Sequence, residues 1–149
     1  MEIVVDANIV FSFFKKDTTP RELILDSELR YNLRLFAPEL ALEEINKHKN
    51  DVCSRFKISP KDFEIMFSSL PLFIKIVKKD TFKEYISKAK EILAPHIKDV
   101  PYAALSLSFK SKGYEIALWS NEERLRILEK YGIKVYSTSK LLKELGLKQ

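Results

Sequence analysis

Cysteine is almost absent from the chain, and the single Cys53 rules out an internal disulfide. Cys53 has no Cys or His companion at metal-ligand spacing, so redox and zinc chemistry are not expected. No apolar run approaches the roughly 18 residues of a membrane span. The chain begins with an apolar stretch that ends in an acid, rather than with a basic segment and a signal core. We therefore expect a cytoplasmic protein with no membrane segment.

Repeats, linkers and low-complexity tracts are also lacking. The 149 residues, 46% of them apolar, are enough for one domain that buries roughly two thirds of its unfolded surface. We expect a single domain over residues 1–149. Lys and Arg outnumber Asp and Glu by 26 to 21, which fits a polyanionic partner but fits a soluble surface equally well.

Five short runs rich in β-branched and aromatic residues alternate with helical patterns. The first, Ile3 to Val5, is apolar at consecutive positions, as in a strand buried on both faces of a parallel sheet. Because each crossover helix must pack back on the sheet, this alternation predicts an α/β fold. We expect a three-layer α/β/α sandwich with a parallel sheet of four to five strands, near residues 3–5, 33–37, 73–77, 115–119 and 133–136.

Prolines and glycines mark the helical segments between these strands. Residues 38–56 are predicted to form one long helix. Ser120 and Glu123 have the spacing of a capping box, which predicts a helix over 121–131 that ends at Gly132. The remaining helices are expected near residues 9–14, 20–31, 60–70, 81–93, 100–112 and 139–145.

Acidic side chains stand where several segments leave one edge of the predicted sheet. Asp6 ends the first strand, and Asn8 follows two residues later. Ligands of open parallel sheets bind outside the carboxyl ends of the strands, which makes Asp6 a candidate for chemistry. A helix cap or an Asx turn explains Asp6 and Asn8 equally well from this stretch alone.

Two adjacent glutamates in the 38–56 helix must be distinguished. At about 100° per residue, Glu43 points away from the apolar face, whereas Glu44 lies at its border. Glu44 is therefore the candidate. His48 borders the same face, where a lone His is more typical of packing than of metal binding, and it is at most a partner of the site.

Two further acids lie at predicted helix starts. Asp99 precedes Pro101 in the first turn of a helix, where an N-cap role is the favoured explanation, although an N-cap can also be a ligand. Glu122 lies in the first turn of the next helix. The helix dipole stabilises a negative charge there only mildly, so the specific position of Glu122 is otherwise unexplained.

The order of these residues resembles the PIN-domain family, which includes the VapC-type ribonuclease toxins and RNA-processing nucleases. The resemblance covers essentially the whole chain. It rests on four short motifs and their spacing: Val5-Asp6-Ala7-Asn8, Ala37-Pro38 with Glu44-Ile45, Lys98-Asp99-Val100-Pro101-Tyr102-Ala103-Ala104-Leu105, and Leu118-Trp119-Ser120-Asn121-Glu122.

The resemblance implies a role for each polar residue of these motifs. Glu122 stands where the family usually has Asp, and its extra methylene moves the carboxylate by about a bond length, which affects a second metal most. Ala7 replaces a frequent Thr. The implied metal-binding and catalytic acids are Asp6, Glu44, Asp99 and Glu122, with Asn8 and Ser120 as supporting residues.

The chemistry of clustered acids agrees with this implication. Converging carboxylates raise each other's pKa unless a cation neutralises them, and all-oxygen ligands suit Mg²⁺ or Mn²⁺. Such an ion activates water and stabilises the charge that develops when a phosphodiester is attacked. Basic residues near the predicted mouth can hold a phosphate backbone or simply be solvated; they are Lys15, Lys16, Lys98 and Arg124.

The resemblance thus implies a metal-dependent endoribonuclease acting on RNA, either the toxin of a toxin–antitoxin pair or an RNA-processing nuclease. An antitoxin protein and a second copy of the chain are candidate partners. The alternative is a weak or inactive nucleic-acid-binding module on the same scaffold. A phosphatase or receiver-like domain that uses Asp6 covalently fits less well, because Asn8 stands where such phosphatases need a second Asp.

Overall fold

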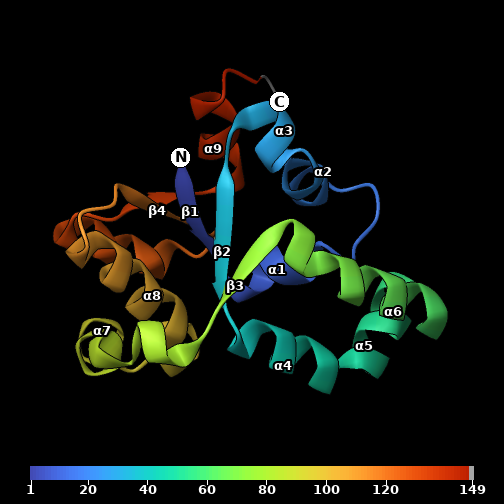
Figure 1. Cartoon of the computed structure of the whole chain (residues 1–149), viewed down its shortest axis with the longest axis horizontal. Helices are drawn as coiled ribbons and strands as arrows, with labels where there is room; N and C mark the ends of the chain where they lie inside the picture. The colour runs from blue at the N-terminus through green and yellow to red at the C-terminus, as the bar shows by residue number, and fades with distance from the viewer. Residues whose placement is uncertain (148–149) are drawn as a thin grey trace.

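The structure, a computed structural model, describes residues 1–147 and is built around a five-stranded parallel sheet (Figure 1). The strand order across the sheet is β3-β2-β1-β4-β5, and every neighbouring pair is parallel. The first strand is therefore central, as suits the strand that the sequence predicts to be buried on both faces. The strands are β1 (Glu2–Val5), β2 (Arg34–Pro38), β3 (Ile74–Val77), β4 (Ile116–Trp119) and β5 (Lys134–Tyr136).

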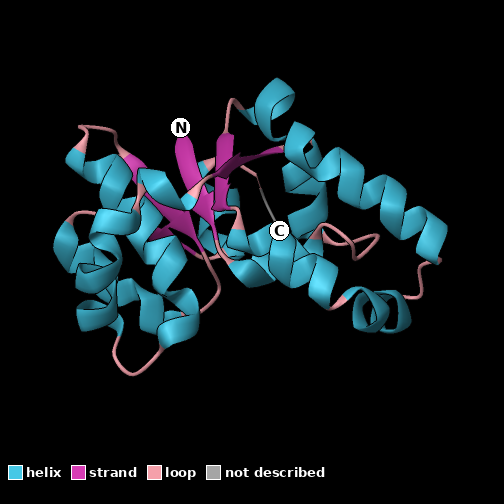
Figure 2. Ribbon diagram, turned by 60° about the horizontal axis from the view of Figure 1, so that its bottom comes forward, coloured by secondary structure: helices cyan, strands magenta, loops and turns pink. Residues whose placement is uncertain are grey.

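Helices cover both faces of the sheet, which confirms the predicted α/β/α sandwich (Figure 2). In Figure 1, α7 and α8 lie on one side of the sheet and α1, α2 and α3 on the other. The α-helices are α1 (Ala7–Ser12), α2 (Thr19–Leu25), α3 (Ser27–Tyr31), α4 (Leu40–Lys47), α5 (Lys49–Phe56), α6 (Pro60–Ser69), α7 (Ile86–Leu93), α8 (Val100–Ser111) and α9 (Thr138–Glu144). Five 3-10 segments complete the elements: η1 (Leu70–Leu72), η2 (Lys79–Thr81), η3 (Lys83–Tyr85), η4 (Ile97–Asp99) and η5 (Glu123–Tyr131).

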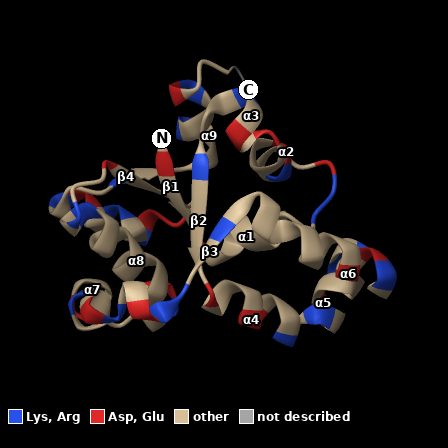
Figure 3. Cartoon of the chain, viewed as in Figure 1, with Lys and Arg blue, Asp and Glu red and all other residues tan. Residues whose placement is uncertain are grey.

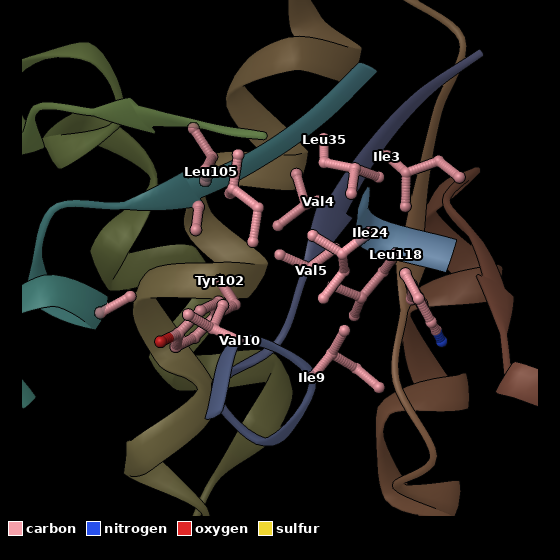
Figure 4. Packing of buried hydrophobic residues seen from close by; sticks show 14 of the residues in the cluster. Ile3, Val4, Val5, Ile9, Val10, Ile24, Leu35, Tyr102, Leu105 and Leu118 are labelled. Atoms are coloured by element: carbon pink, nitrogen blue, oxygen red, sulfur yellow. The ribbon is translucent and has the colours of Figure 1, made fainter. Parts of the chain in front are cut away.

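The central strand is buried on both faces. Ile3, Val4 and Val5 have no exposed surface, and Figure 4 shows them packed among side chains of the neighbouring strands and helices. Burial of one such aliphatic side chain contributes about 1.5–3 kcal/mol. The core thus holds β1 in place, and with it the backbone of Asp6, the residue that follows the strand.

The predicted helix over residues 38–56 is wrong as a single element. Helix α4 ends at Lys47, His48 has a φ of −103° and a ψ of 23°, and α5 begins at Lys49. The expected helix over residues 20–31 is likewise divided, at Asp26. No glycine or proline marks either break. The apolar periodicity continues across both positions, so a prediction from periodicity joins the two helices into one.

Strand register determines which residues meet at the carboxyl edge of the sheet. Val5 pairs with Trp119, and the backbone N–H of Asp6 donates to the carbonyl of Trp119 at 3.1 Å. Asp6 and Ser120 therefore leave neighbouring strands side by side. Strand β2 ends at the same edge, and α4 begins just beyond it (Figure 1).

Charged residues lie mainly in the outer helices and loops, and the strands contain few of them (Figure 3). Among residues 1–147, no helix is long and apolar enough to cross a membrane.

Candidate active site

Asp6 is a buried carboxylate that is held by two neutral donors. It is the N-cap of α1, and its Oδ1 accepts from the backbone N–H of Ile9 at 2.9 Å. Its Oδ2 accepts from the hydroxyl of Ser120. Burial, with 2% of the residue exposed, raises the pKa of Asp6 to about 6; the two hydrogen bonds oppose this rise, and the charges of Asp99 and Glu122 add to it. Asp6 is thus confirmed as a helix cap. Its carboxylate is at the same time close enough to Asp99 and Glu122 to be affected by their charges.

Ser120 does not form the predicted capping box. Its hydroxyl accepts from the backbone N–H of Glu122 at 3.0 Å while it donates to Asp6. The following segment is the 3-10 segment η5, which starts at Glu123 without a side-chain cap. The capping box is wrong because the Ser120 oxygen accepts from the N–H of Glu122, two residues on, and not from that of Glu123. The proton of the hydroxyl goes to the Asp6 carboxylate, which the β1–β4 register places beside it.

Both carboxylate oxygens of Glu122 are engaged. Oε1 accepts from the side-chain amide of Asn8 at 3.2 Å, and Oε2 accepts from Nη1 of Arg124 at 3.3 Å. Asn8 lies in the first turn of α1, so this hydrogen bond joins the segments that follow β1 and β4. Asn8 therefore helps to orient the carboxylate of Glu122.

Asp99 occupies the N-cap position of α8 but makes no capping hydrogen bond. Its Oδ2 instead accepts two hydrogen bonds from Arg124, from Nη2 at 2.7 Å and from Nε at 3.2 Å. Asp99 is 7% exposed. The N-cap explanation is therefore wrong for the side chain, which pairs with Arg124 instead.

The two adjacent glutamates lie as the helical pattern predicts. Glu43 is exposed and Glu44 is partly buried. The nearest cationic candidate to Glu44 is His48, whose Nε2 lies 3.9 Å from Oε2 and is charged only when protonated. Among residues 1–147, no Lys or Arg forms an ion pair with the Glu44 carboxylate.

Three of the four acids line one cavity of about 460 Å³, called here the acid cavity. Glu44, Asp99 and Glu122 line it together with Asn8 and seven others: Ala7, Leu40, Ile97, Lys98, Pro101, Tyr102 and Arg124. The fourth acid, Asp6, is joined to the cavity through Ser120, whose hydroxyl contacts both Asp6 and the backbone of Glu122. Within residues 1–147, no group of three or more Asp, Glu, His or Cys side chains is arranged to hold a metal ion. A cation of the chain itself, Arg124, bridges two of the acids instead.

Tyr102 contributes a hydroxyl that periodicity does not reveal. The residue is 2% exposed, lines the acid cavity, and its hydroxyl has no hydrogen-bond partner among the described residues. Figure 4 shows the ring in the core with the oxygen pointing out of the cluster. Burial raises the pKa of Tyr102, and the charges of Asp6, Glu44 and Asp99 raise it further. Its one sequence signal is its position three residues after Asp99, on the same side of the helix start.

A second cavity of about 660 Å³ adjoins the first and is called here the basic groove. Asn8 and Lys98 line both cavities. Of the predicted phosphate-binding residues, Lys15 and Lys98 line the groove, Lys16 is exposed outside its lining, and Arg124 lies in the acid cavity. The remaining lining residues, whose role sequence reasoning missed or weighed low, are Phe11, Ser12, His48, Asp51, Val52, Arg55 and Phe56.

Comparison with known families gives one match to the chain. The family model for the PIN domain matches residues 4–146, a range that contains the four acids, Asn8 and Ser120. A search of curated proteins gives no match to the chain.

Proposed function

The chain belongs to the PIN-domain family, and from this premise we propose that it is a Mg²⁺- or Mn²⁺-dependent endoribonuclease. PIN domains are in general nucleases, and they typically use divalent metals. The observation that supports the proposal is that Glu44, Asp99 and Glu122 line one cavity at the carboxyl edge of the parallel sheet, with Asp6 joined to the backbone of Glu122 through Ser120. This is the edge at which such sheets bind their ligands.

The donors of the site fit a hard divalent cation. Asp6, Glu44, Asp99 and Glu122 offer only oxygen atoms, which Mg²⁺ and Mn²⁺ prefer. The buried hydroxyl of Tyr102 has no hydrogen-bond partner within residues 1–147, as expected of a group that a water molecule or a ligand satisfies. These four acids would hold the ion. When bound, such an ion lowers the pKa of water and stabilises negative charge on the phosphoryl oxygens.

The chain's own residues hold the acids in place for this task. The Ser120 hydroxyl and the Ile9 N–H fix the two oxygens of Asp6. Asn8 fixes one oxygen of Glu122. Strand register and the start of α1 thus fix the donors that orient Asp6 and Glu122.

The basic groove supports RNA as the substrate. Lys15, Arg55 and Lys98 line it, and it opens into the acid cavity at Asn8 and Lys98. Arg55 lies 3.5 Å from Asp51 in an exposed ion pair, which costs little to exchange for a phosphate contact. A strand held in the groove by its phosphates would pass the acids, where hydrolysis breaks one P–O bond while water supplies the new oxygen. The preference for RNA over DNA rests on the family alone.

The alternative, a nucleic-acid-binding module with weak or no activity, rests on Glu122 in place of the usual Asp. Glu122→Asp separates the two functions. An active but stretched site keeps or gains activity on this change, whereas a binding module stays inactive. The covalent use of Asp6 that a phosphatase requires gains no support, since Asn8 is used to orient Glu122.

The test is cleavage of single-stranded RNA by the purified protein in Mg²⁺ or Mn²⁺. We expect cleavage that stops in EDTA and is lost in Asp6→Asn, which removes a ligand charge at nearly constant volume. RNA binding without cleavage in either ion, with no rescue by Glu122→Asp, would replace this function with the binding module. The toxin form of the proposal is tested in cells, where expression of the wild type and not of Asp6→Asn should arrest growth.

A further inference from the structure

A third cavity adjoins the acid cavity and is called here the apolar pocket. Its volume is about 420 Å³, and sites for small organic ligands usually measure roughly 300–1,000 Å³. Leu40, Ile97 and Pro101 line both cavities. Six of the ten lining residues of the pocket are apolar: Leu40, Phe82, Ile86, Ile97, Val100 and Pro101. A mainly apolar wall with a few polar groups is typical of a site for an organic ligand.

The acid cavity therefore has two different neighbours. The basic groove meets it at Asn8 and Lys98, whereas the apolar pocket meets it at the starts of α4, η4 and α8. Among residues 1–147, none lines both the groove and the pocket. Because a phosphodiester joins two nucleotides, a phosphate at the acids needs room for a nucleotide on each side. The two neighbouring cavities offer that room.

The charges of these two neighbours differ. The basic groove is lined by three Lys or Arg side chains, those of Lys15, Arg55 and Lys98, and by one acid, Asp51. The apolar pocket is lined by two acids and two lysines, whose formal charges cancel: Glu39, Glu43, Lys79 and Lys90. A polyanionic backbone is thus favoured in the groove rather than in the pocket. The uncharged part of a nucleotide, which suits the pocket, is its base.

We propose that the apolar pocket binds a nucleobase of single-stranded RNA, from the nucleotide next to the phosphate held at the acids. This inference rests on RNA as the substrate of the proposed function, and it requires no particular number of metal ions. Ile97, which lines both cavities, is 69% exposed, so its apolar surface is open to a base. A base inside a duplex is paired and stacked, whereas an unpaired base can turn out and enter a pocket. The pocket therefore selects unpaired RNA.

The chain offers a matched control for Ile97. Ile65, on α6, is 59% exposed and lines none of the three cavities. Because both side chains are largely exposed, neither Ile97→Ser nor Ile65→Ser leaves a gap in the core. Each substitution removes apolar surface and keeps the net charge of the protein. Only Ile97→Ser changes the wall of the apolar pocket.

The experiment compares a single-stranded RNA with an oligonucleotide that has the same ribose-phosphate backbone but no bases. Binding is measured by fluorescence anisotropy in Mg²⁺ on an Asp6→Asn background. We expect Ile97→Ser to lower the affinity for the RNA by about fivefold or more and to leave the affinity for the abasic backbone unchanged. Ile65→Ser should change neither affinity. Equal losses for the two ligands, or no loss for the RNA, would overturn the inference.

A spectroscopic measurement locates the base. With the isoleucine methyl groups labelled for NMR, the RNA and not the abasic backbone should shift the signals of Ile86 and Ile97. Neither ligand should shift the signal of Ile65. Ile86 lines the apolar pocket and not the acid cavity, so its shift reports on the pocket itself. RNA that binds without shifting the Ile86 signal would place the base elsewhere and overturn the inference.

The two proposals fail separately. RNA that binds with these effects, but that the wild type does not cut, keeps this inference and loses the nuclease function. RNA that the wild type cuts, with the Ile86 signal and the affinity of Ile97→Ser unchanged, keeps the nuclease function and loses this inference. A protein that binds no RNA loses both.

Discussion

The hydroxyl of Ser120 donates a hydrogen bond to the buried carboxylate of Asp6, although 114 residues of chain separate them. The contact follows from the parallel pairing of β1 with β4, in which Val5 lies opposite Trp119. Asp6 and Ser120, which follow these two residues, therefore lie side by side. A central strand with three fully buried aliphatic residues cannot shift its register without exposing them. The acid at the strand tip is thus positioned by the core.

Asp6→Asn should stabilise the metal-free protein at neutral pH. Burial raises the pKa of Asp6 to about 6 in the folded state, above its unfolded value near 4. The neutral acid is therefore favoured by the fold; its contribution to stability is full below pH ~4 and is lost as the pH rises through ~6. The neutral amide of the variant avoids this loss, which is worth up to about 3 kcal/mol.

Urea unfolding in EDTA at pH 4 and pH 8 measures this difference. The advantage of Asp6→Asn should be small at the lower pH and largest at the higher pH. At pH 8, Mn²⁺ should reverse the order, because it stabilises the wild type through the carboxylate. An advantage that does not change with pH would show that Asp6 ionises as an ordinary surface acid.

Glu44→Gln and Glu43→Gln form a matched pair of substitutions. Glu44 is partly buried and lines the acid cavity, whereas Glu43 is exposed and does not line it. Glu44→Gln should weaken Mn²⁺ binding by more than about tenfold, and Glu43→Gln should leave it nearly unchanged. Titration calorimetry with Mn²⁺ decides between them, and equal losses would remove Glu44 from the site.

Tyr102→Phe should affect stability and metal binding in opposite directions. The hydroxyl is buried without a partner among the described residues, so its removal from the metal-free protein should be neutral or stabilising by about 1 kcal/mol. Mn²⁺ should then raise the melting temperature of the variant less than that of the wild type, because a group that orders the ligand is missing. Thermal unfolding with and without Mn²⁺ tests this, and a destabilised variant with an unchanged Mn²⁺ shift would assign Tyr102 to packing alone.

Lys15→Glu should weaken RNA binding in the basic groove. Measured by fluorescence anisotropy on an Asp6→Asn background, the change should lower affinity for every RNA sequence and reduce the slope of log affinity against log salt by about 1. Lys61→Glu, an exposed lysine on α6 outside both cavities, is the control. Equal effects of the two substitutions would mean that only net charge matters and that the groove is not the path of RNA.

The strands were readable from the sequence because they depend on short-range patterns. Consecutive β-branched residues predict β1, and the helical phase separates Glu43 from Glu44. Arg124 was not readable as the partner of Asp99, since the two lie 25 residues apart and only the fold brings them together. Ser120 was assigned to a local capping box, whereas its hydroxyl donates to Asp6, which is 114 residues away in the sequence and which only the strand pairing brings near.

The break at His48 shows a different limit. The apolar pattern continues from α4 into α5, and no glycine or proline interrupts it. The turn of the chain at this point places His48 and Arg55 along the basic groove, a tertiary arrangement that periodicity does not encode.

The chemical ends of the cleaved RNA test the central claim most directly. Attack by water yields a linear phosphomonoester on one fragment, whereas a metal-independent ribonuclease that uses the 2′-hydroxyl yields a 2′,3′-cyclic phosphate. Mass spectrometry of products made in Mn²⁺ by the wild type and by Asp6→Asn, purified in parallel, distinguishes these outcomes. We predict linear ends only, formed by the wild type and abolished both by EDTA and in Asp6→Asn. Cyclic ends that persist in EDTA, or equal cleavage by Asp6→Asn, would contradict a carboxylate-held metal as the source of the activity.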